Sequence, residues 1–215
     1  MALFSVSLFG GNLLDISGSI DTAINAGADA LHIDIMDGYL TPDFGFNIGT
    51  AKTIAASYDI EVDVHLMVKK PDEFLGRFCD PNFNCITVQA EECKDVCGCL
   101  RTIKSFGIKS GLAIAPNTAA SEVKEYIPLC DEMIVMTVVP GEGGGRIKAN
   151  AIDKIFEIRS AANAVGSNIH IAVDGSMNVD RANRCVELGA DKIIVGTAFY
   201  SAKDRTGFGK MIKGL

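Results

Sequence analysis

The chain has 215 residues, 48% of them hydrophobic, which is enough for one sizeable core and predicts a single domain over residues 1–215. Its 27 acidic and 20 basic residues give a formal net charge of −7, and the basic residues form no runs, which argues against a nucleic-acid or anionic-membrane surface. The apolar start of the chain lacks a leading Lys or Arg and is soon broken by Gly10 and Gly11. We interpret it as a first strand, neither a signal peptide nor a membrane span, and we expect a cytoplasmic protein.

Short apolar runs alternate with longer amphipathic segments along the chain. The runs predict strands at 4–9, 30–36, 61–68, 85–90, 110–115, 132–138, 170–174 and 192–196. The amphipathic segments predict helices at 13–27, 51–58, 72–78, 94–107, 151–166 and 179–190, and several end in a glycine that suits a helix C-terminus: Gly27, Gly107, Gly166 and Gly189.

Eight strand–helix units of roughly 27 residues each have the number and size of a minimal (β/α)₈ TIM barrel. An open doubly wound sheet is the alternative fold, but it usually has fewer strands and a ligand-binding glycine turn near its first strand. Here the glycine-rich loop VVPGEGGGRI follows the sixth predicted strand. The pattern therefore favours the barrel.

Polar residues interrupt strands that should be apolar. His32 and Asp34 alternate along one strand, His65 occupies the next strand, and Asp174 ends the seventh. Side chains two apart share a face of a strand, and the inward faces converge at the carboxyl end of a barrel. Two imidazoles and two carboxylates around one point suit a divalent metal cation (Zn, Mn, Fe or Co). The alternative is that these groups pair with one another inside the barrel.

Two other polar residues receive structural interpretations. His170 begins its strand, so we expect it at the opposite end of the barrel, where it would contribute to stability. Asp37 lies past its strand on the opposite parity to Asp34, so we expect it to order the DGYL turn.

Small residues follow the last three predicted strands, and they would present backbone N–H groups at the same end of the barrel. Such loops allow a phosphate to approach the backbone, and loops seven and eight are a common phosphate site in these barrels. The residues are Gly141, Gly143, Gly144 and Gly145, then Gly175 and Ser176, then Gly196 and Thr197.

A metal beside two carboxylates and a phosphate site indicates chemistry on a phosphorylated sugar. A metal-stabilised enediolate would form when one carboxylate removes a proton next to a ketone. Asp34 and Asp174 come from strands well separated around the ring, so one could remove the proton and the other return it to the opposite face. The expected reaction is epimerisation.

The segments HIDIMDG, DVHLMV, VMTVVPGEGGG, VDGS and LGADKIIVGTA together resemble the ribulose-phosphate 3-epimerase family over nearly the whole chain. The resemblance implies a ribulose-phosphate-binding barrel, a homo-oligomeric assembly, and exchange of D-ribulose 5-phosphate with D-xylulose 5-phosphate. It implies Asp34 and Asp174 as the acid–base pair. The remaining implied residues are the metal ligands His32, Asp34, His65 and Asp174, and the substrate contacts Ser5, His65, Met36, Met67 and Met136.

Alternatives remain open. Ser176 in VDGS resembles the branch that acts on D-allulose 6-phosphate, which is the alternative substrate. Barrels related to orotidine decarboxylase carry Asp-x-Lys-x-x-Asp, but His65 occupies the place of that Lys. The third hypothesis is a binding or regulatory protein that keeps the barrel but has lost catalytic turnover. It is motivated by departures from the family pattern at Asp43, Gly45, Gln89 and Glu142.

The seven cysteines include a cluster at Cys93, Cys97 and Cys99. Its spacing matches neither the usual zinc pairs nor a CxxC redox motif. We interpret these residues as small apolar side chains on one helix, with a soft-metal site as the alternative.

Overall fold

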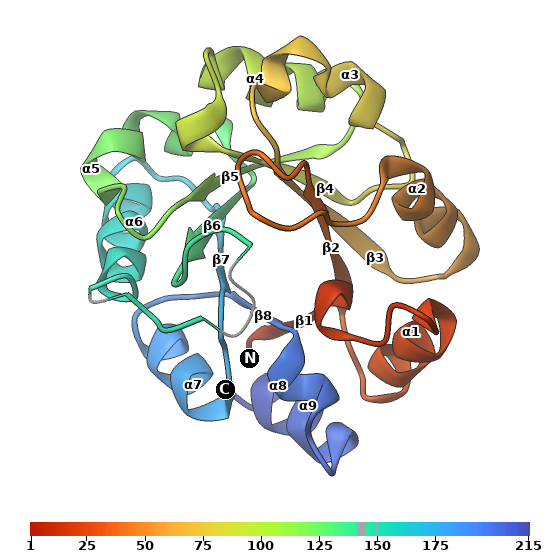
Figure 1. Cartoon of the computed structure of the whole chain (residues 1–215). Helices are drawn as coiled ribbons and strands as arrows, with labels where there is room; N and C mark the ends of the chain where they lie inside the picture. Colours follow the sequence, from red (N-terminus) through yellow and green to blue (C-terminus); the bar gives the residue numbers. More distant parts are fainter. Residues whose placement is uncertain (142–144, 149) are drawn as a thin grey trace.

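The computed structural model of the chain describes residues 1–141, 145–148 and 150–215. Eight parallel strands form a closed barrel in chain order, and β8 pairs with β1. Helices surround the barrel on the outside (Figure 1). The strands are β1 (Leu3–Ser7), β2 (Ala30–Met36), β3 (Glu61–Met67), β4 (Cys85–Gln89), β5 (Lys109–Ile114), β6 (Glu132–Met136), β7 (His170–Asp174) and β8 (Lys192–Val195). The predicted (β/α)₈ barrel is confirmed.

The helices vary in length around the ring, and short 3-10 turns follow several strands. The α-helices are α1 (Ile16–Asn25), α2 (Ile48–Ser57), α3 (Leu75–Phe78), α4 (Val96–Ser105), α5 (Ala120–Val123), α6 (Asp153–Ala164), α7 (Val179–Glu187), α8 (Thr197–Tyr200) and α9 (Arg205–Lys213). The 3-10 turns are η1 (Leu8–Gly10), η2 (Pro71–Glu73), η3 (Ala90–Glu92) and η4 (Lys124–Leu129).

Local sequence explains where the helices begin and end. An Asp or Asn precedes α1, α2, α4, α7 and α9, and its side chain accepts a hydrogen bond from a backbone N–H of the first turn. The predicted terminal glycines all adopt a positive φ, which ends a helix without steric cost. They are Gly27 (84°), Gly107 (77°), Gly166 (67°) and Gly189 (106°).

Strand alternation divides the apolar residues into two groups. Leu31, Ile33 and Ile35 point outward from β2 and pack in the layer between barrel and helices. A separate, smaller cluster fills the inside of the barrel and includes three methionines near its carboxyl end. Its members are Met36, Met67, Ala113, Ile134, Met136, Ala172 and Ile194. Polar residues on the inward face therefore lie in an apolar, enclosed setting.

Candidate active site

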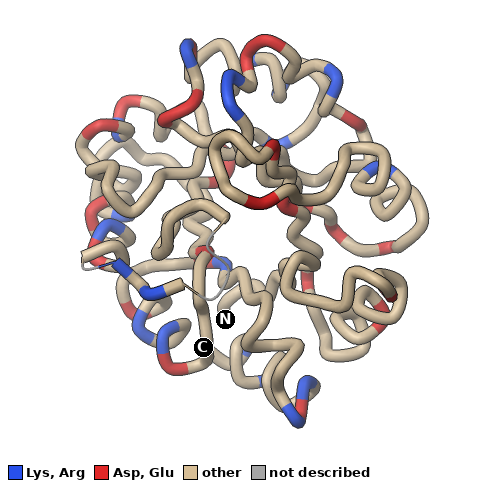
Figure 2. The backbone as a smooth tube through the Cα atoms, in the orientation of Figure 1, with Lys and Arg blue, Asp and Glu red and all other residues tan. Residues whose placement is uncertain are grey.

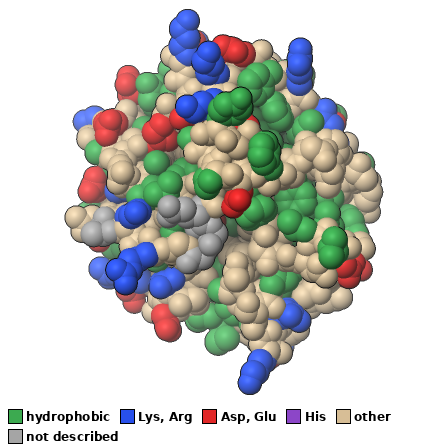
Figure 3. Space-filling view, viewed as in Figure 1, with side chains coloured by type: hydrophobic (Ala, Val, Ile, Leu, Met, Phe, Trp, Pro, Cys, Tyr) green, Lys and Arg blue, Asp and Glu red, His purple; other side chains and the backbone are tan. Residues whose placement is uncertain are grey.

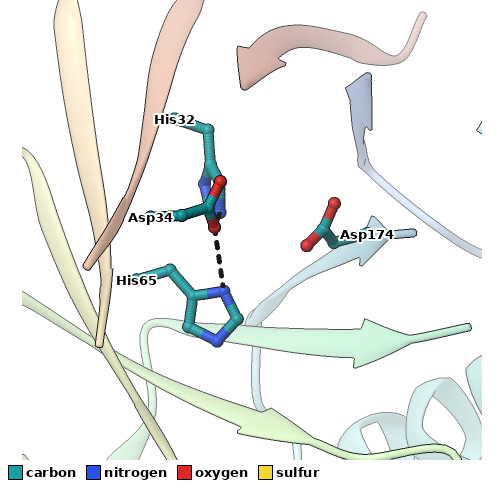
Figure 4. A group of neighbouring side chains, drawn as sticks. All are labelled: His32, Asp34, His65 and Asp174. Carbon is teal, nitrogen blue, oxygen red and sulfur yellow. Dashed lines mark ion pairs between the residues drawn. The ribbon is translucent and has the colours of Figure 1, made fainter. Parts of the chain in front are cut away.

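Four polar side chains converge inside the barrel near the carboxyl ends of β2, β3 and β7. His32, Asp34, His65 and Asp174 each offer a ligand atom, and these atoms all lie within 4.8 Å of one another. His32 Nε2 lies 3.3 Å and His65 Nδ1 3.7 Å from Asp34 Oδ1. Asp174 approaches the other three from across the barrel (Figure 4). The structure thus brings together the quartet that the sequence indicated.

Most of this cluster is removed from solvent. His32, Asp34 and His65 are 1%, 5% and 0% exposed. Both ring nitrogens of each histidine, and Oδ1 of Asp34, have no hydrogen-bond partner among the described residues. Buried polar atoms normally have partners, so this concentration of unpaired ligand atoms is unusual.

Burial and mutual charge separate the pKa values of the four groups. Burial disfavours the imidazolium of His32, but the charge and hydrogen bond of Asp34, together with the charges of Asp174 and Asp63, outweigh burial and raise the pKa of His32 to about 9. For His65, burial and the charge of His32 lower the pKa to about 3. Burial works against the Asp34 carboxylate, yet His32 and a hydrogen bond from Ser7 lower its pKa. Burial and the charge of Asp34 raise the pKa of Asp174 to about 6.

The serine nearest this cluster is Ser7. Its hydroxyl donates to Asp34 Oδ2 at 2.8 Å, and Ser7 lines the cavity above the cluster. Ser5, which the resemblance placed near the substrate, is fully buried and does not line that cavity. Both serines share the inward face of β1, but Ser7 pairs in register with His32, whereas Ser5 pairs with Ala30, further from the mouth. Ser7 is thus the serine of β1 that lines the cavity, and a substrate contact by Ser5 stays a prediction.

A cavity of about 710 Å³ opens above the quartet. Asp34 and Asp174 lie in its wall, while His65 is enclosed behind them. Its apolar wall contains Met36, Met67 and Met136, as expected. The sulfur of Met136 accepts a hydrogen bond from the side chain of Gln89 at 2.8 Å.

The loops after β6, β7 and β8 form the other side of the cavity. Gly175 has a φ of +110°, and a Cβ there would lie 2.7 Å from a methyl carbon of Val138, so only glycine fits. The Ser176 hydroxyl donates to the carbonyl of Gly145 at 2.6 Å and joins two of the loops. The expected cavity residues are Gly141, Gly145, Gly175, Ser176, Gly196 and Thr197. Gly143, Gly144 and Glu142 lie outside the described residues.

The wall also contains two arginines, of which Arg181 was missed in the sequence. Arg146 follows the sixth strand, and Arg181 lies in the first turn of α7, where it donates to the carbonyl of Ser176. Acidic and basic residues are mixed around the barrel as a whole (Figure 2). On the face that carries the loop after β6, however, basic side chains gather at the lower left (Figure 3). An arginine in the amphipathic segment 179–190 gave no signal that its side chain would line this cavity.

The structure also places the other polar and glycine residues that the sequence analysis named. Asp37 accepts hydrogen bonds from the backbone N–H groups of Tyr39, Leu40 and Lys69, which confirms its role in the turn. His170 lines a cavity at the amino-terminal end of the barrel, also as expected. Neither Asp43 nor Gly45 lines the large cavity.

The family of the chain follows from comparison with known proteins. A model of the "Ribulose-phosphate 3 epimerase family" matches residues 3–200. The chain belongs to the ribulose-phosphate 3-epimerase family. It is therefore an isomerase of the racemase and epimerase class, as the sequence indicated.

Curated relatives cover nearly the whole chain. A "Ribulose-phosphate 3-epimerase" of Bacillus subtilis (strain 168) is 30% identical over 200 residues, which are 93% of this chain and 92% of the relative. Another of that name, from Aquifex aeolicus (strain VF5), is 28% identical and covers 100% of this chain and 97% of the relative. The epimerase family match thus extends around the entire barrel.

Solved structures share the fold at low sequence identity. A 3-keto-L-gulonate-6-phosphate decarboxylase from Vibrio cholerae has a TM-score of 0.75 at 12% identity, with 99% of this chain and 96% of that chain covered. A 3-hexulose-6-phosphate synthase from Salmonella typhimurium has a TM-score of 0.73 at 19% identity, covering 100% and 97%. These similarities support the barrel alone.

In the part of this epimerase-family chain that the structure describes, no helix has the length and apolarity needed to cross a membrane.

Proposed function

We propose that this protein is a metal-dependent 3-epimerase of a phosphorylated ketose, with D-ribulose 5-phosphate and D-xylulose 5-phosphate as the substrate pair. One observation carries the proposal. The carboxylates of Asp34 and Asp174 come from β2 and β7, separate positions in the ring, and share one site with two histidines at the base of a 710 Å³ cavity. Epimerisation needs two proton-transfer groups on opposite faces of a planar intermediate, and this geometry supports that requirement.

The side chains of the quartet fit a divalent cation. Two imidazoles and two carboxylates form a mixed N/O set that Zn²⁺, Mn²⁺, Fe²⁺ and Co²⁺ accept. The unpaired, buried nitrogens of His32 and His65 and Oδ1 of Asp34 are the atoms that a cation would satisfy. A bound cation would polarise the ketone of the substrate and stabilise the negative charge that develops on its oxygens.

The two carboxyl groups divide the proton transfers. His32 and Ser7 hold the pKa of Asp34 low, so its carboxylate is ionised and removes the proton from C3. The pKa of Asp174, raised to about 6, makes it the more readily protonated of the two carboxyl groups and so the one that returns a proton to the opposite face. In the reverse direction the two residues exchange these tasks.

The rest of the cavity would bind and enclose the sugar phosphate. Residues of the loops after β7 and β8 line the same cavity as Arg146 and Arg181, a combination that suits a phosphate group. Met36, Met67 and Met136 line the cavity between the phosphate loops and the quartet. Their apolar side chains would exclude water from the planar intermediate.

The experiment is hydrogen exchange at C3. Metal-loaded protein incubated in D₂O should place deuterium at C3 of D-ribulose 5-phosphate as it forms D-xylulose 5-phosphate. Asp34→Asn and Asp174→Asn should each lower the epimerisation rate about 10²–10⁴-fold, because each removes one acid–base group. Circular dichroism would show that both variants fold. Absence of deuterium in product from the unaltered protein, or normal rates in either variant, would overturn the proposal.

D-allulose 6-phosphate is the second substrate to test. The motif VDGS, which resembles that of the allulose branch, motivates it, and Ser176 of this motif lines the cavity. A side-by-side measurement of kcat/KM for the two sugar phosphates decides between them. Homo-oligomerisation and a cytoplasmic location stay predictions.

A further inference from the structure

A second group of metal-ligating side chains lies outside the barrel. Asp72, Cys93 and Cys99 each offer one ligand atom, and these atoms all lie within 4.8 Å of one another. They come from three segments: Asp72 from η2 after β3, Cys93 from the loop after η3, and Cys99 from α4. The cysteines are spaced as Cys-x₅-Cys, and the carboxylate is distant in sequence, so no sequence motif announces the group.

The backbone holds two of these ligands in place. Asp72 accepts hydrogen bonds from the N–H groups of Lys94 and Asp95 at 3.0 and 2.9 Å, so its carboxylate is fixed against the start of α4. Cys99 is only 3% exposed and is anchored within that helix. A cation would find these ligands already oriented, which lowers the entropic cost of binding.

A cation from solvent would reach these ligands beside the third one, Cys93. Cys93 is half-buried, and it lines a surface depression of about 330 Å³ together with Glu91 and Cys97. Its thiol donates to the carbonyl of Gln89 at 3.3 Å. In this same position the sulfur lies within 4.8 Å of the other two ligand atoms.

The donor atoms select the kind of cation. In a tetrahedral zinc site with Zn–S bonds of about 2.3 Å, two sulfurs lie about 3.8 Å apart, and the ligand atoms here lie within 4.8 Å of one another. Thiolate sulfur favours Zn²⁺ and similar soft cations over Mg²⁺, Ca²⁺ or Mn²⁺. We propose that Asp72, Cys93 and Cys99 form a second metal site, which binds a thiophilic divalent cation of the zinc type. Each thiol releases its proton to solvent on binding, and water completes the fourth position.

A cation at this position would join two loops of the barrel. Asp72 follows β3, the strand of His65 and Met67, whereas Cys93 follows β4, the strand of Gln89. The cation would cross-link these loops on the outside of the barrel, away from the cavity. Its role is thus structural, and it is independent of the proposed epimerase chemistry.

Cobalt(II) is a suitable probe because it binds both kinds of site, and its charge-transfer absorption in the near ultraviolet distinguishes the site that contains sulfur. Thiolate ligands give Co²⁺ an intense charge-transfer absorption in the near ultraviolet, and the barrel quartet contains no sulfur. Fully reduced protein, kept with a phosphine reductant, should show this absorption and bind two Co²⁺ per chain. Cys93→Ser and Cys99→Ser should lose the absorption and bind one. Cys97→Ser is the matched control and should behave like the unaltered protein.

Two further variants separate this site from the barrel. Asp174→Asn should weaken cobalt binding in the barrel while it leaves the charge-transfer absorption intact, so failure of the proposed function would not remove the signal. Asp72→Asn should weaken the sulfur-bound cobalt at least tenfold, whereas Glu73→Gln, beside it, should not. Absence of the absorption in the unaltered protein, or its survival in both Cys93→Ser and Cys99→Ser, would overturn the second site.

Discussion

The hydroxyl of Ser7 connects β1 to the carboxylate of Asp34. It donates to Oδ2, while the two histidines lie near Oδ1. A hydrogen bond to a buried charged group contributes about 1.5–3 kcal/mol to the stability of the fold, because no water molecule takes its place in the buried site. Ser7 thereby stabilises the ionised form of Asp34 and keeps this proposed base active at lower pH.

Ser7→Ala should move the acidic limb of the pH profile of kcat/KM to higher pH. The variant loses a donor to the carboxylate, so the pKa of Asp34 rises and a smaller fraction of the base is ionised at a given low pH. We expect kcat/KM to fall about tenfold on the acidic limb, consistent with the loss of a charge-assisted hydrogen bond, and to change little near neutral pH. The measurement is a pH–rate profile with either sugar phosphate.

Ser5→Ala is the matched control, because it removes the same hydroxyl two residues earlier on the same face of β1. Ser5 Oγ has no hydrogen-bond partner among the described side chains and backbone. The profile of this variant should superimpose on that of the unaltered protein. An acidic limb that shifts equally in both variants would contradict the role given to Ser7.

The two serines also show how far a sequence predicts a site. Alternation along β1 indicates that Ser5 and Ser7 both face inward, as alternation in β2 does for His32 and Asp34. Depth along the barrel axis depends instead on the stagger between neighbouring strands, here the pairing of Ser7 with His32. Stagger is set by packing of the whole ring, so a single strand does not reveal it. The quartet was predictable because all its members lie near the carboxyl ends of their strands.

At the scale of elements, the segment around Gly45 supports the end of β2. Gly45 N–H donates to the carbonyl of Met36 at 3.3 Å, and Phe46 N–H donates to that of Asp34 at 2.9 Å. A Cβ on residue 45 would lie 2.3 Å from the Asp34 carbonyl oxygen and 2.7 Å from the Met36 nitrogen. The departure from the family pattern at Gly45 therefore has a structural reason: the loop packs directly on the strand that carries Asp34.

Gly45→Ala should destabilise the fold and impair the site together. The added methyl group meets backbone atoms, which cannot rotate away, so we expect a loss of about 1–3 kcal/mol in the free energy of unfolding. Displacement of Asp34 should also lower kcat. Urea unfolding and steady-state kinetics measure the two effects.

Gly76→Ala in α3 is the control for this substitution. The nearest atom to its added Cβ is 3.8 Å away in the side chain of Phe106, an ordinary contact. Alanine is also the better helix former, so stability should stay the same or rise by up to about 1 kcal/mol. Equal destabilisation by both substitutions would exclude a specific role for the contact between Gly45 and β2.

The elements themselves were predictable to different degrees. The strands at 30–36 and 170–174 have the bounds that their apolar runs indicated, and the other strand ends differ by at most two residues. Three helices were not among the predicted segments: α5, α8 and α9. The first two have only four residues each, too few to show helical periodicity. In α9, Gly207 and Gly209 interrupt the pattern.

At the scale of the whole molecule, three strands meet through charges at the amino-terminal end of the barrel. Lys192 on β8 lies 2.8 Å from Asp63 on β3 and also pairs with Glu132 on β6. All three are less than 5% exposed, and Asn84 adds a hydrogen bond to Asp63 at 3.0 Å. No sequence pattern indicated this triad, because its members are far apart in the chain and only closure of the ring brings them together.

The triad depends on its single cation. Burial disfavours the charged form of Lys192, but Asp63 and Glu132 outweigh burial and raise its pKa. Burial raises the pKa of Glu132, and the charge of Lys192 opposes that rise. Without the lysine, the pKa of Glu132 would rise further above its value of about 4.3 in the unfolded chain. Folding would then take up a proton at pH values where the unfolded chain has none.

Lys192→Met should therefore destabilise the barrel in a pH-dependent way. At pH 8 both carboxylates are left buried without a cation, and we expect a loss of about 3–5 kcal/mol in the free energy of unfolding. A group with a raised folded pKa stabilises the fold only at low pH, so the loss should shrink at pH 5, where Glu132 can bind a proton. Urea unfolding of variant and parent at the two pH values measures this difference.

Lys109→Met is the matched control, because Lys109 is exposed and lines the cavity at the amino-terminal end of the barrel that Lys192 also lines. This substitution should change stability by less than about 0.5 kcal/mol at either pH. Lys192→Met combined with Glu132→Leu should regain part of the lost stability at pH 8, since one unpaired carboxylate is removed. A loss of equal size at pH 5 and pH 8 would show that Lys192 acts through packing of its aliphatic chain, not through its charge.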